Sequence, residues 1–190
     1  EAVLLVSLME AADRVDSTTG LQMAYLKSWA PRALNDLELR MPEVLPGPGK
    51  ATMMDAIEAA KKLSADLAYL DPPYNQHSYL GNYHVWETLV RWDKPEVYGT
   101  ACKRVECKEY HSPFNSRKEI HKAMRDVIDS LDVKYLIVSF NNEGFITKEE
   151  MEGMLRTRGV VRTIEIDYKR YVGAQIGIYS PQGVKVGRAS

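Results

Sequence analysis

The sequence predicts an α/β protein whose sheet is largely parallel and ends in an antiparallel strand. Two short apolar runs, 67–71 and 135–140, stop at turn residues and have the pattern of strands buried on both faces. Helical patterns alternate with these runs, which favours a parallel sheet. Two alternating segments, 160–168 and 173–179, are joined by only a few residues, which permits a hairpin and no crossover helix.

The composition fits one soluble globular domain. The chain has 190 residues, of which 45% are hydrophobic and 27% are charged. The formal net charge of -1 argues against nucleic-acid binding by bulk positive charge, but it allows a local basic groove. Two cysteines are too few for a disulfide framework, so a reducing cytoplasm is the expected location. No apolar run is long enough to span a bilayer, and no membrane partner is expected.

The first fifty residues are expected to be helical and then to form a linker. Residues 2–16 carry a broad apolar face, and residues 22–33 are expected to form a shorter helix. Residues 37–41 alternate like a short exposed strand, and the prolines and glycines of 42–49 predict a loop. The chain opens at Glu1 directly in a helical pattern, which suggests a processed or incompletely represented chain.

The middle of the chain alternates helices, a strand and a long loop. Residues 55–63 and 79–92 have helical patterns on either side of the first predicted strand. Residues 94–116 read as a long polar loop, a length that is often functional, and residues 117–131 as the next helix.

A turn and a capped helix follow the second predicted strand. Asn141-Asn142-Glu143-Gly144 breaks that strand. Thr147 with Glu150 three residues later has the pattern of a capping box, which predicts that a helix starts here.

The segment Asp71-Pro72-Pro73-Tyr74 follows the first predicted strand and suits chemistry on the amine of a base. An adenine amine is a poor nucleophile because its lone pair is delocalised into the ring. A strand-end carboxylate can accept one amine hydrogen, and the carbonyl of Pro72, held by two restricted backbones, can accept the other. The Tyr74 ring can stack on the base, worth about 1–3 kcal/mol. A base inside a duplex must first be flipped out.

This motif and its surroundings resemble the Dam-type DNA adenine methyltransferases. The resemblance covers roughly residues 55–179. Besides Asp71–Tyr74 it rests on Asn75, Tyr79, Asn82-Tyr83-His84, Trp86-Glu87-Thr88, Ser139–Gly144 and Tyr168–Tyr171. It implies a Rossmann-like methyltransferase sheet, S-adenosylmethionine as cofactor, double-stranded DNA as partner and a place in a restriction-modification system.

The resemblance also implies roles for individual residues. Asp71, Pro72, Pro73 and Tyr74 would form the catalytic site, with Asp71 and the Pro72 carbonyl on the amine and Tyr74 on the flipped adenine. Asp55 would bind the adenine of the cofactor, and Asp71 is counted with it among the cofactor contacts. No metal is expected. The implied DNA and target-base contacts are Asn75, His77, Tyr79, Asn141, Asn142, Tyr168, Lys169, Arg170 and Tyr171.

The sequence departs from the family pattern in one respect. The family's Gly-rich cofactor loop of the Phe-x-Gly-x-Gly type is missing, and Gly47-Pro48-Gly49 fits a plain connection better. The N-terminal strands of the sheet are therefore expected to be missing as well. Residues 1–50 would then be a target-recognition-like segment and linker, and residues 51–190 the catalytic part. An N-terminal segment or a separate chain would supply the loop, and this chain alone is expected to be inactive.

Simpler structural roles compete with several of these assignments. The Asp-Pro-Pro-Tyr segment could be a strand-end turn, Asp55 a helix cap, and Asn141 and Asn142 turn residues. His77 and His84 are equally well explained as ordinary surface histidines. A zinc site at Cys102, Cys107 and His111 lacks a fourth ligand at a sensible spacing.

Two functions from different classes are compatible with the sequence. The first is S-adenosylmethionine-dependent methylation of adenine in DNA, with the cytosine amine as an open alternative target. The second is a non-catalytic, methyltransferase-like module that binds DNA or a partner, because its cofactor loop is missing. The DNA recognition sequence cannot be read from one sequence.

Overall fold

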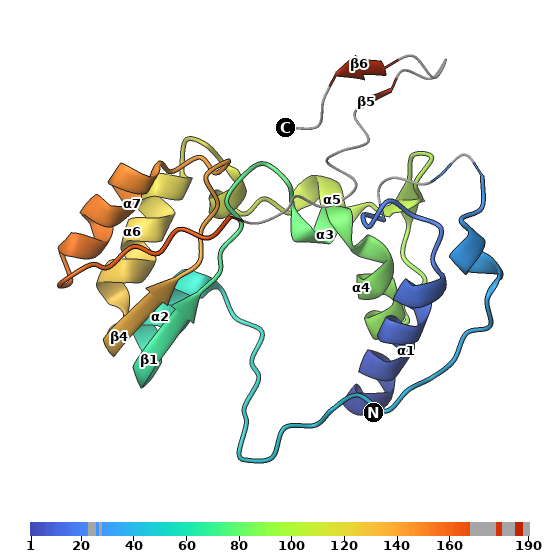
Figure 1. Cartoon of the computed structure of the whole chain (residues 1–190), viewed down its shortest axis with the longest axis horizontal. Coiled ribbons are helices and arrows are strands. Elements are labelled where there is room, and N and C mark those ends of the chain that lie inside the picture. Colours follow the sequence, from blue (N-terminus) through green and yellow to red (C-terminus); the bar gives the residue numbers. More distant parts are fainter. Residues whose placement is uncertain (23–25, 27, 168–177, 180–184, 188–190) are drawn as a thin grey trace. The chain divides into compact units, whose positions relative to one another are not determined.

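The computed structural model describes residues 1–22, 26, 28–167, 178–179 and 185–187. The chain divides into two compact units (Figure 1). Unit 1 comprises residues 1–49, 79–110 and 170–190, and unit 2 comprises residues 50–78 and 111–169. Residues 79–110, inside the predicted catalytic part, thus fall in the first unit. The predicted functional division at residue 50 stays a prediction.

Unit 2 is an α/β unit built around two parallel strands. Strand β1 pairs with β4, and the register places Leu70 opposite Val138 at their carboxyl ends. The elements of unit 2 are α2 (Ala56–Lys62), β1 (Ser64–Leu70), the 3-10 helix η2 (Pro113–Asn115), α6 (Ile120–Ser130), β4 (Asp132–Val138) and α7 (Lys148–Arg156).

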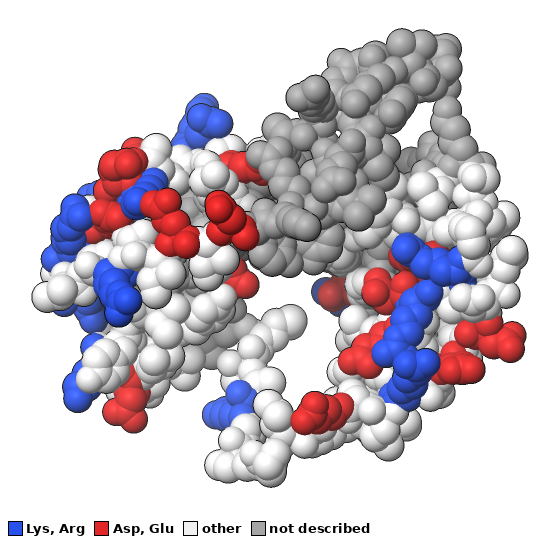
Figure 2. Space-filling model, viewed as in Figure 1, with Lys and Arg blue, Asp and Glu red and all other residues white. Residues whose placement is uncertain are grey.

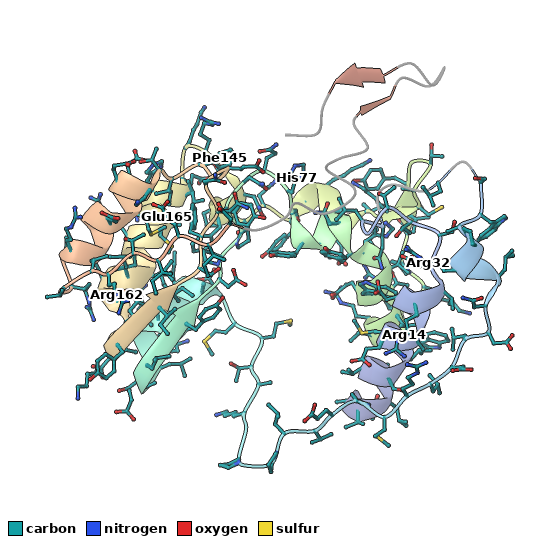
Figure 3. The ribbon with its side chains drawn as sticks, in the orientation of Figure 1. Arg14, Arg32, His77, Phe145, Arg162 and Glu165 are labelled. Carbon is teal, nitrogen blue, oxygen red and sulfur yellow. The ribbon has the colours of Figure 1, made fainter. Side chains whose placement is uncertain are left out.

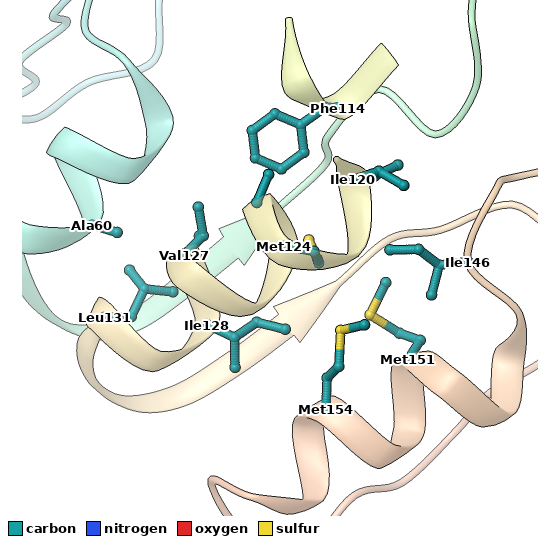
Figure 4. Packing of buried hydrophobic residues seen from close by; sticks show 11 residues of the cluster. Ala60, Phe114, Ile120, Met124, Val127, Ile128, Leu131, Ile146, Met151 and Met154 are labelled. Carbon is teal, nitrogen blue, oxygen red and sulfur yellow. The ribbon is translucent and has the colours of Figure 1, made fainter. Parts of the chain in front are cut away.

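The core of unit 2 is centred on helix α6. Ile120, Met124, Val127 and Ile128 recur at helical spacing and are all at most 3% exposed. Helix η2 contributes the buried Phe114 (Figure 4). The other members of the cluster are Ala60, Ala123, Leu131, Ile146, Met151 and Met154.

The sheet is covered on one face only, so the expectation of two buried faces is wrong for the described residues. Ala68 and Leu70 of β1 pack against the core. Leu67 and Tyr69 point the other way and are 47% and 59% exposed. Strand β4 has the same arrangement. Leu136 and Val138 pack against the core, and Tyr135 and Ile137 are exposed. No other described segment covers the second face, and the outer edges of both strands lack a described strand partner.

Unit 1 consists mainly of helices and short connections. Its elements are α1 (Ala2–Val15), η1 (Pro31–Leu34), α3 (Tyr79–Asn82), α4 (His84–Arg91), β2 (Val97–Tyr98), β3 (Lys103–Arg104), α5 (Glu106–Glu109), β5 (Ile178–Tyr179) and β6 (Lys185–Gly187). None of the helices in the described residues is long and apolar enough to cross a membrane.

Side-chain hydrogen bonds join distant segments of unit 1. Gln22 accepts from the backbone N–H groups of Val85 (2.8 Å) and Trp86 (3.3 Å), so it caps α4 from more than sixty residues away. The buried Arg104 donates to Asp93 at 2.6 and 2.8 Å and also pairs with Glu106.

Several predicted elements differ from the structure. The predicted helix over 79–92 is broken at Tyr83 into α3 and α4. The predicted loop over 94–116 contains the antiparallel pair β2–β3, α5 and η2. The described part of 22–33 forms only η1, and residues 37–41 form no strand.

The predicted terminal hairpin differs from the structure in its first strand. Residues 160–167 belong to no strand. They lie along α7 instead, where Glu165 pairs with Lys148 and Thr163 donates to Glu152 at 2.6 Å (Figure 3). The antiparallel pair near the end of the chain is β5–β6, and residues 168 and 173–177 lie outside the described residues. The coarse expectation holds, because the fold mixes α and β elements around a parallel pair of strands.

Candidate active site

The two strand-end segments meet because β1 and β4 are parallel neighbours. The Ser139 N–H donates to the Leu70 carbonyl at 2.9 Å, at the point where both strands end. Asp71-Pro72-Pro73-Tyr74 and Ser139–Gly144 therefore start side by side. The carboxyl edge of a parallel sheet is also where open α/β folds bind their ligands.

Tyr74 is held through its ring and through its backbone. Its ring meets the Phe140 ring edge-on, with centroids 6.1 Å apart and planes at 69°. Its carbonyl accepts from the Phe145 N–H at 2.8 Å. Asp71 itself is exposed, whereas Pro72 and Pro73 are half-buried. The carboxylate is thus available to a ligand at the end of the sheet.

Asn141 forms the turn after β4. Its side-chain oxygen accepts from the Glu143 N–H at 2.7 Å, and its carbonyl accepts from the Gly144 N–H at 3.1 Å. A Cβ on Gly144 would lie 2.5 Å from the Phe140 ring, so any other residue here would displace that ring. A turn role for Asn141 is therefore present in the structure, and the exposed Asn142 sits beside it.

Asn75 and His77 form a second turn, directly after the Asp-Pro-Pro-Tyr segment. The side-chain oxygen of Asn75 accepts from the His77 N–H at 3.0 Å. The Asn115 side chain donates to the carbonyls of both residues, at 2.7 Å for Asn75 and 3.1 Å for His77. Arg117, two residues further, places its guanidinium 4.8 Å from the centre of the Phe145 ring (Figure 3 labels Phe145 and His77). We call residues 71–77, 113–117 and 139–145 together the strand-end junction.

Asp55 serves as the N-cap of α2. One carboxylate oxygen accepts from the N–H groups of Ile57 (2.9 Å) and Glu58 (3.2 Å). The capping role expected as the simpler alternative is therefore confirmed. The segment leading into α2 arrives at the arrowhead end of β1 (Figure 1), so a ligand contact by the exposed carboxylate remains compatible with the cap.

Not all predicted site residues belong to the junction. Tyr79 begins α3 in unit 1, where its ring stacks on Tyr83 at 6.1 Å and 21°. Tyr168, Lys169, Arg170 and Tyr171 lie outside the described residues.

His84 is not a surface histidine. It is 1% exposed, and its Nε2 atom has no hydrogen-bond partner in the described residues. Burial lowers the pKa of His84, and the nearby Lys103 and Arg104 lower it further, against a hydrogen bond with the Gln22 backbone.

The cysteines have ordinary environments. Cys102 is exposed, whereas burial raises the pKa of the half-buried Cys107. The described residues hold no cluster of three or more His, Cys, Asp or Glu side chains that suits a metal ion.

Sequence reasoning missed Asn115, and it assigned no role of their own to Phe140 and Gly144, which it included only as part of the second strand-end motif. Asn115 lies at the end of the segment read as a loop, and its signal is weak: Ser112-Pro113 starts a short turn, and Phe114 is an apolar residue among polar ones. The Phe140 and Gly144 contacts depend on where the two turns place their backbones, which single residues do not reveal.

The surface charges are mixed. Figure 2 shows acidic and basic side chains interspersed over the described surface on this face, in line with the net charge of -1.

The chain belongs to the D12 class N6 adenine-specific DNA methyltransferase family, which it matches over residues 2–154. Enzymes of this kind are methyltransferases, and methyltransferases in general use S-adenosylmethionine.

Curated relatives are modification methylases. The chain is similar to modification methylase StsI of Streptococcus sanguinis (36% identical, covering 88% of this chain and 26% of the relative). It is also similar to type II methyltransferase M.FokI of Planomicrobium okeanokoites (35% identical, 90% and 27%) and to M.NlaIII of Neisseria lactamica (29% identical, 88% and 50%). The chain thus spans about a quarter of the length of the first two relatives. No solved structure matches it significantly.

Proposed function

We propose that this chain is the catalytic part of a DNA methyltransferase that transfers a methyl group from S-adenosylmethionine to the N6 amine of adenine in double-stranded DNA. The observation that carries this proposal is the position of Asp71-Pro72-Pro73-Tyr74 at the carboxyl end of β1, next to the end of β4, in a member of the D12 family. The names of the relatives support a role as the modification methylase of a restriction-modification system. We propose the cytoplasm as its location, as expected for a chain with two cysteines.

The proposed roles of residues 71–74 follow from what methylation of the adenine amine requires. Asp71 would accept one N6 hydrogen and the Pro72 carbonyl the other, which orients the lone pair out of the ring plane. Tyr74 would stack on the flipped base, and its contacts with Phe140 and Phe145 would keep the ring in place. When bound, S-adenosylmethionine supplies a methyl group on a sulfonium sulfur: the S–CH3 bond breaks as the N6–CH3 bond forms, and one amine proton leaves to water.

The described residues fit one end of this cofactor. The exposed carboxylates of Asp55 and Asp71 can accept from the adenosine end. For the methionine end, the described residues offer no glycine cradle at 47–49, because a Cβ on Gly47 or Gly49 would meet only open space. We therefore propose that an N-terminal segment or a separate chain completes the cofactor site.

DNA recognition is assigned to residues around this loop. Within our proposal residues 1–50 are a target-recognition-like segment and linker, and residues 51–190 are the catalytic part. Asn75, His77, Tyr79, Asn141, Asn142, Tyr168, Lys169, Arg170 and Tyr171 are proposed contacts to the DNA or the target base. The match to an N6 adenine-specific family favours adenine over cytosine as the target.

The test replaces Asp71 in the protein expressed at the full length of its coding sequence. Asp71→Ala and Asp71→Asn should each lower incorporation of tritiated methyl into adenine-containing duplex DNA by about 100-fold or more, as for other orienting groups. Circular dichroism should be unchanged. Asp132→Ala is a matched control, because Asp132 is an exposed carboxylate at the opposite end of the same sheet.

Two results would contradict the proposal. Activity of the Asp71 variants within about tenfold of wild type would remove the assigned role. A wild-type protein without methyl transfer would favour the non-catalytic module that binds DNA or a partner.

A further inference from the structure

The Asn115 side chain is the link between helix η2 and the turn that follows the candidate catalytic residues. Its Nδ2 donates to the carbonyls of Asn75 at 2.7 Å and His77 at 3.1 Å. Both partners are carbonyl oxygens, which can only accept, so the amide nitrogen must face them. A single side chain thus uses both of its donor hydrogens on one turn.

Asn115 is itself held firmly in unit 2. Its neighbour Phe114 is buried in the core around α6. Ser112 caps the short helix, accepting from the Phe114 N–H at 3.3 Å through its hydroxyl and from the Asn115 N–H at 3.0 Å through its carbonyl. The amide of Asn115 is therefore presented from a fixed platform.

The turn at residues 75–77 also has a hydrogen bond of its own. The bond from the His77 N–H to the Asn75 side chain is local to it. Upstream, the Phe145 N–H fixes the Tyr74 carbonyl. Phe145 thus fixes the loop at Tyr74. The two bonds from Asn115 fix it at Asn75 and His77, which follow Tyr74 in the chain.

We propose that Asn115 is a positioning residue for methyl transfer, which fixes residues 75–77 and through them the geometry of Asp71–Tyr74. This inference rests on the proposed function. Asn75 is only partly buried and His77 is exposed, so water can replace the amide if Asn115 is lost. Each lost bond then costs little folding free energy, but the reacting groups lose a fixed position, to which methyl transfer is far more sensitive.

The test compares Asn115→Ala, Asn115→Asp and Ser112→Ala in the full-length protein. Both Asn115 variants should lower kcat by at least about tenfold while KM for S-adenosylmethionine stays within about twofold, the pattern of misplaced reacting groups. Ser112→Ala is the matched control: it removes the long hydroxyl contact to the Phe114 N–H, but the backbone bond from Asn115 to Ser112 and the burial of Phe114 remain, so the amide stays on the turn and kcat should stay near wild type.

Asn115→Asp adds a pH signature that a merely structural role would not give. The ionised carboxylate faces two carbonyl oxygens and repels them, so this variant should be less active than Asn115→Ala at neutral pH. Once protonated, the carboxyl can donate to one carbonyl again. Its activity relative to wild type should therefore rise as the pH falls.

The outcomes separate this inference from the function on which it rests. If Asp71→Ala abolishes methyl transfer while both Asn115 variants keep kcat within about twofold, the inference is wrong and the function stands. If the Asn115 variants lose their thermal unfolding transition, or Ser112→Ala lowers kcat equally, the role of Asn115 is structural and the inference also falls. An inactive wild-type protein overturns both.

Discussion

At the scale of single residues, the described contacts of Tyr74 use its ring and its backbone carbonyl. Phe140 packs against the ring, and Phe145 bonds to the backbone carbonyl of Tyr74. Tyr74→Phe should therefore keep activity near wild type, whereas Tyr74→Ala should weaken stacking on the flipped base by about 1–3 kcal/mol.

Fluorescence of 2-aminopurine at the target position measures this stacking directly. The Phe variant should change it as the wild type does, and the Ala variant should not. Equal responses of wild type and Tyr74→Ala would count against a stacking role.

The buried His84 should make the stability of unit 1 depend on pH. Burial holds the pKa of His84 in the folded chain below its usual value of 6.5. As the pH falls through about 6.5, the unfolded chain takes up a proton that the folded unit does not, so the folded unit loses stability. The uncharged His84→Gln variant should lose less stability between about pH 8 and about pH 5.

Tryptophan fluorescence can follow this in unit 1 alone, because Trp29, Trp86 and Trp92 all belong to it. The measurement is the urea midpoint of wild type and variant at the two pH values. The change in midpoint between the two pH values is then compared between wild type and variant. This comparison removes the contribution of the titrating groups that both proteins share. Parallel pH dependences would show that His84 does not titrate as its burial implies.

At the scale of elements, helix α7 offers the clearest test. Its capping box is complete: Thr147 accepts from the Glu150 N–H at 3.2 Å, and Glu150 accepts from the Thr147 N–H at 2.8 Å. Thr147→Ala should cost about 1 kcal/mol of folding free energy, and Thr147→Ser should retain most of it. Amide hydrogen exchange in α7 measures the difference; equal exchange in both variants would mean that the cap contributes nothing.

Elements with local signals could be predicted from the sequence. The capping box of α7, the cap at Asp55 and the apolar runs of β1 and β4 all lie at or close to the predicted positions. The sequence also placed Asp71 and Asn141 after the ends of two strands, and the structure pairs these strands in parallel, so both residues follow the carboxyl edge of the sheet.

Elements that depend on distant partners could not be predicted. The break at Tyr83 is stabilised by Gln22, which caps α4 from far away in the sequence. Residues 37–41 and 160–167 have an alternating pattern, but no described strand offers them a ladder of hydrogen bonds, so pattern alone does not make them strands. Periodicity likewise could not tell that helices cover only one face of the sheet.

At the scale of the whole molecule, our proposal that the cofactor site is incomplete sets an expectation for the 190-residue chain. It should bind S-adenosylmethionine with a dissociation constant weaker than about 100 μM, because among the described residues we assign acceptors to the adenosine end alone. Isothermal titration of this chain checks it. A constant in the low micromolar range, near −8 kcal/mol, would mean that a cofactor loop has been overlooked in residues 1–50.

The bonds from Asn115 also bring together the two ends of a long excursion of the chain. The polypeptide leaves unit 2 after residue 78 and returns to it at residue 111, while His77 and Asn115 stay in contact. Residues 79–110 thus leave and re-enter unit 2 at neighbouring points, although they also bond to Gln22 within unit 1. A flexible Gly/Ser bridge of about five residues can join such neighbouring ends, since its mean span is on the order of 12 Å. Segments of other lengths and sequences can therefore replace residues 79–110 without changing the parallel pairing of β1 with β4 or the order of these strands in the chain.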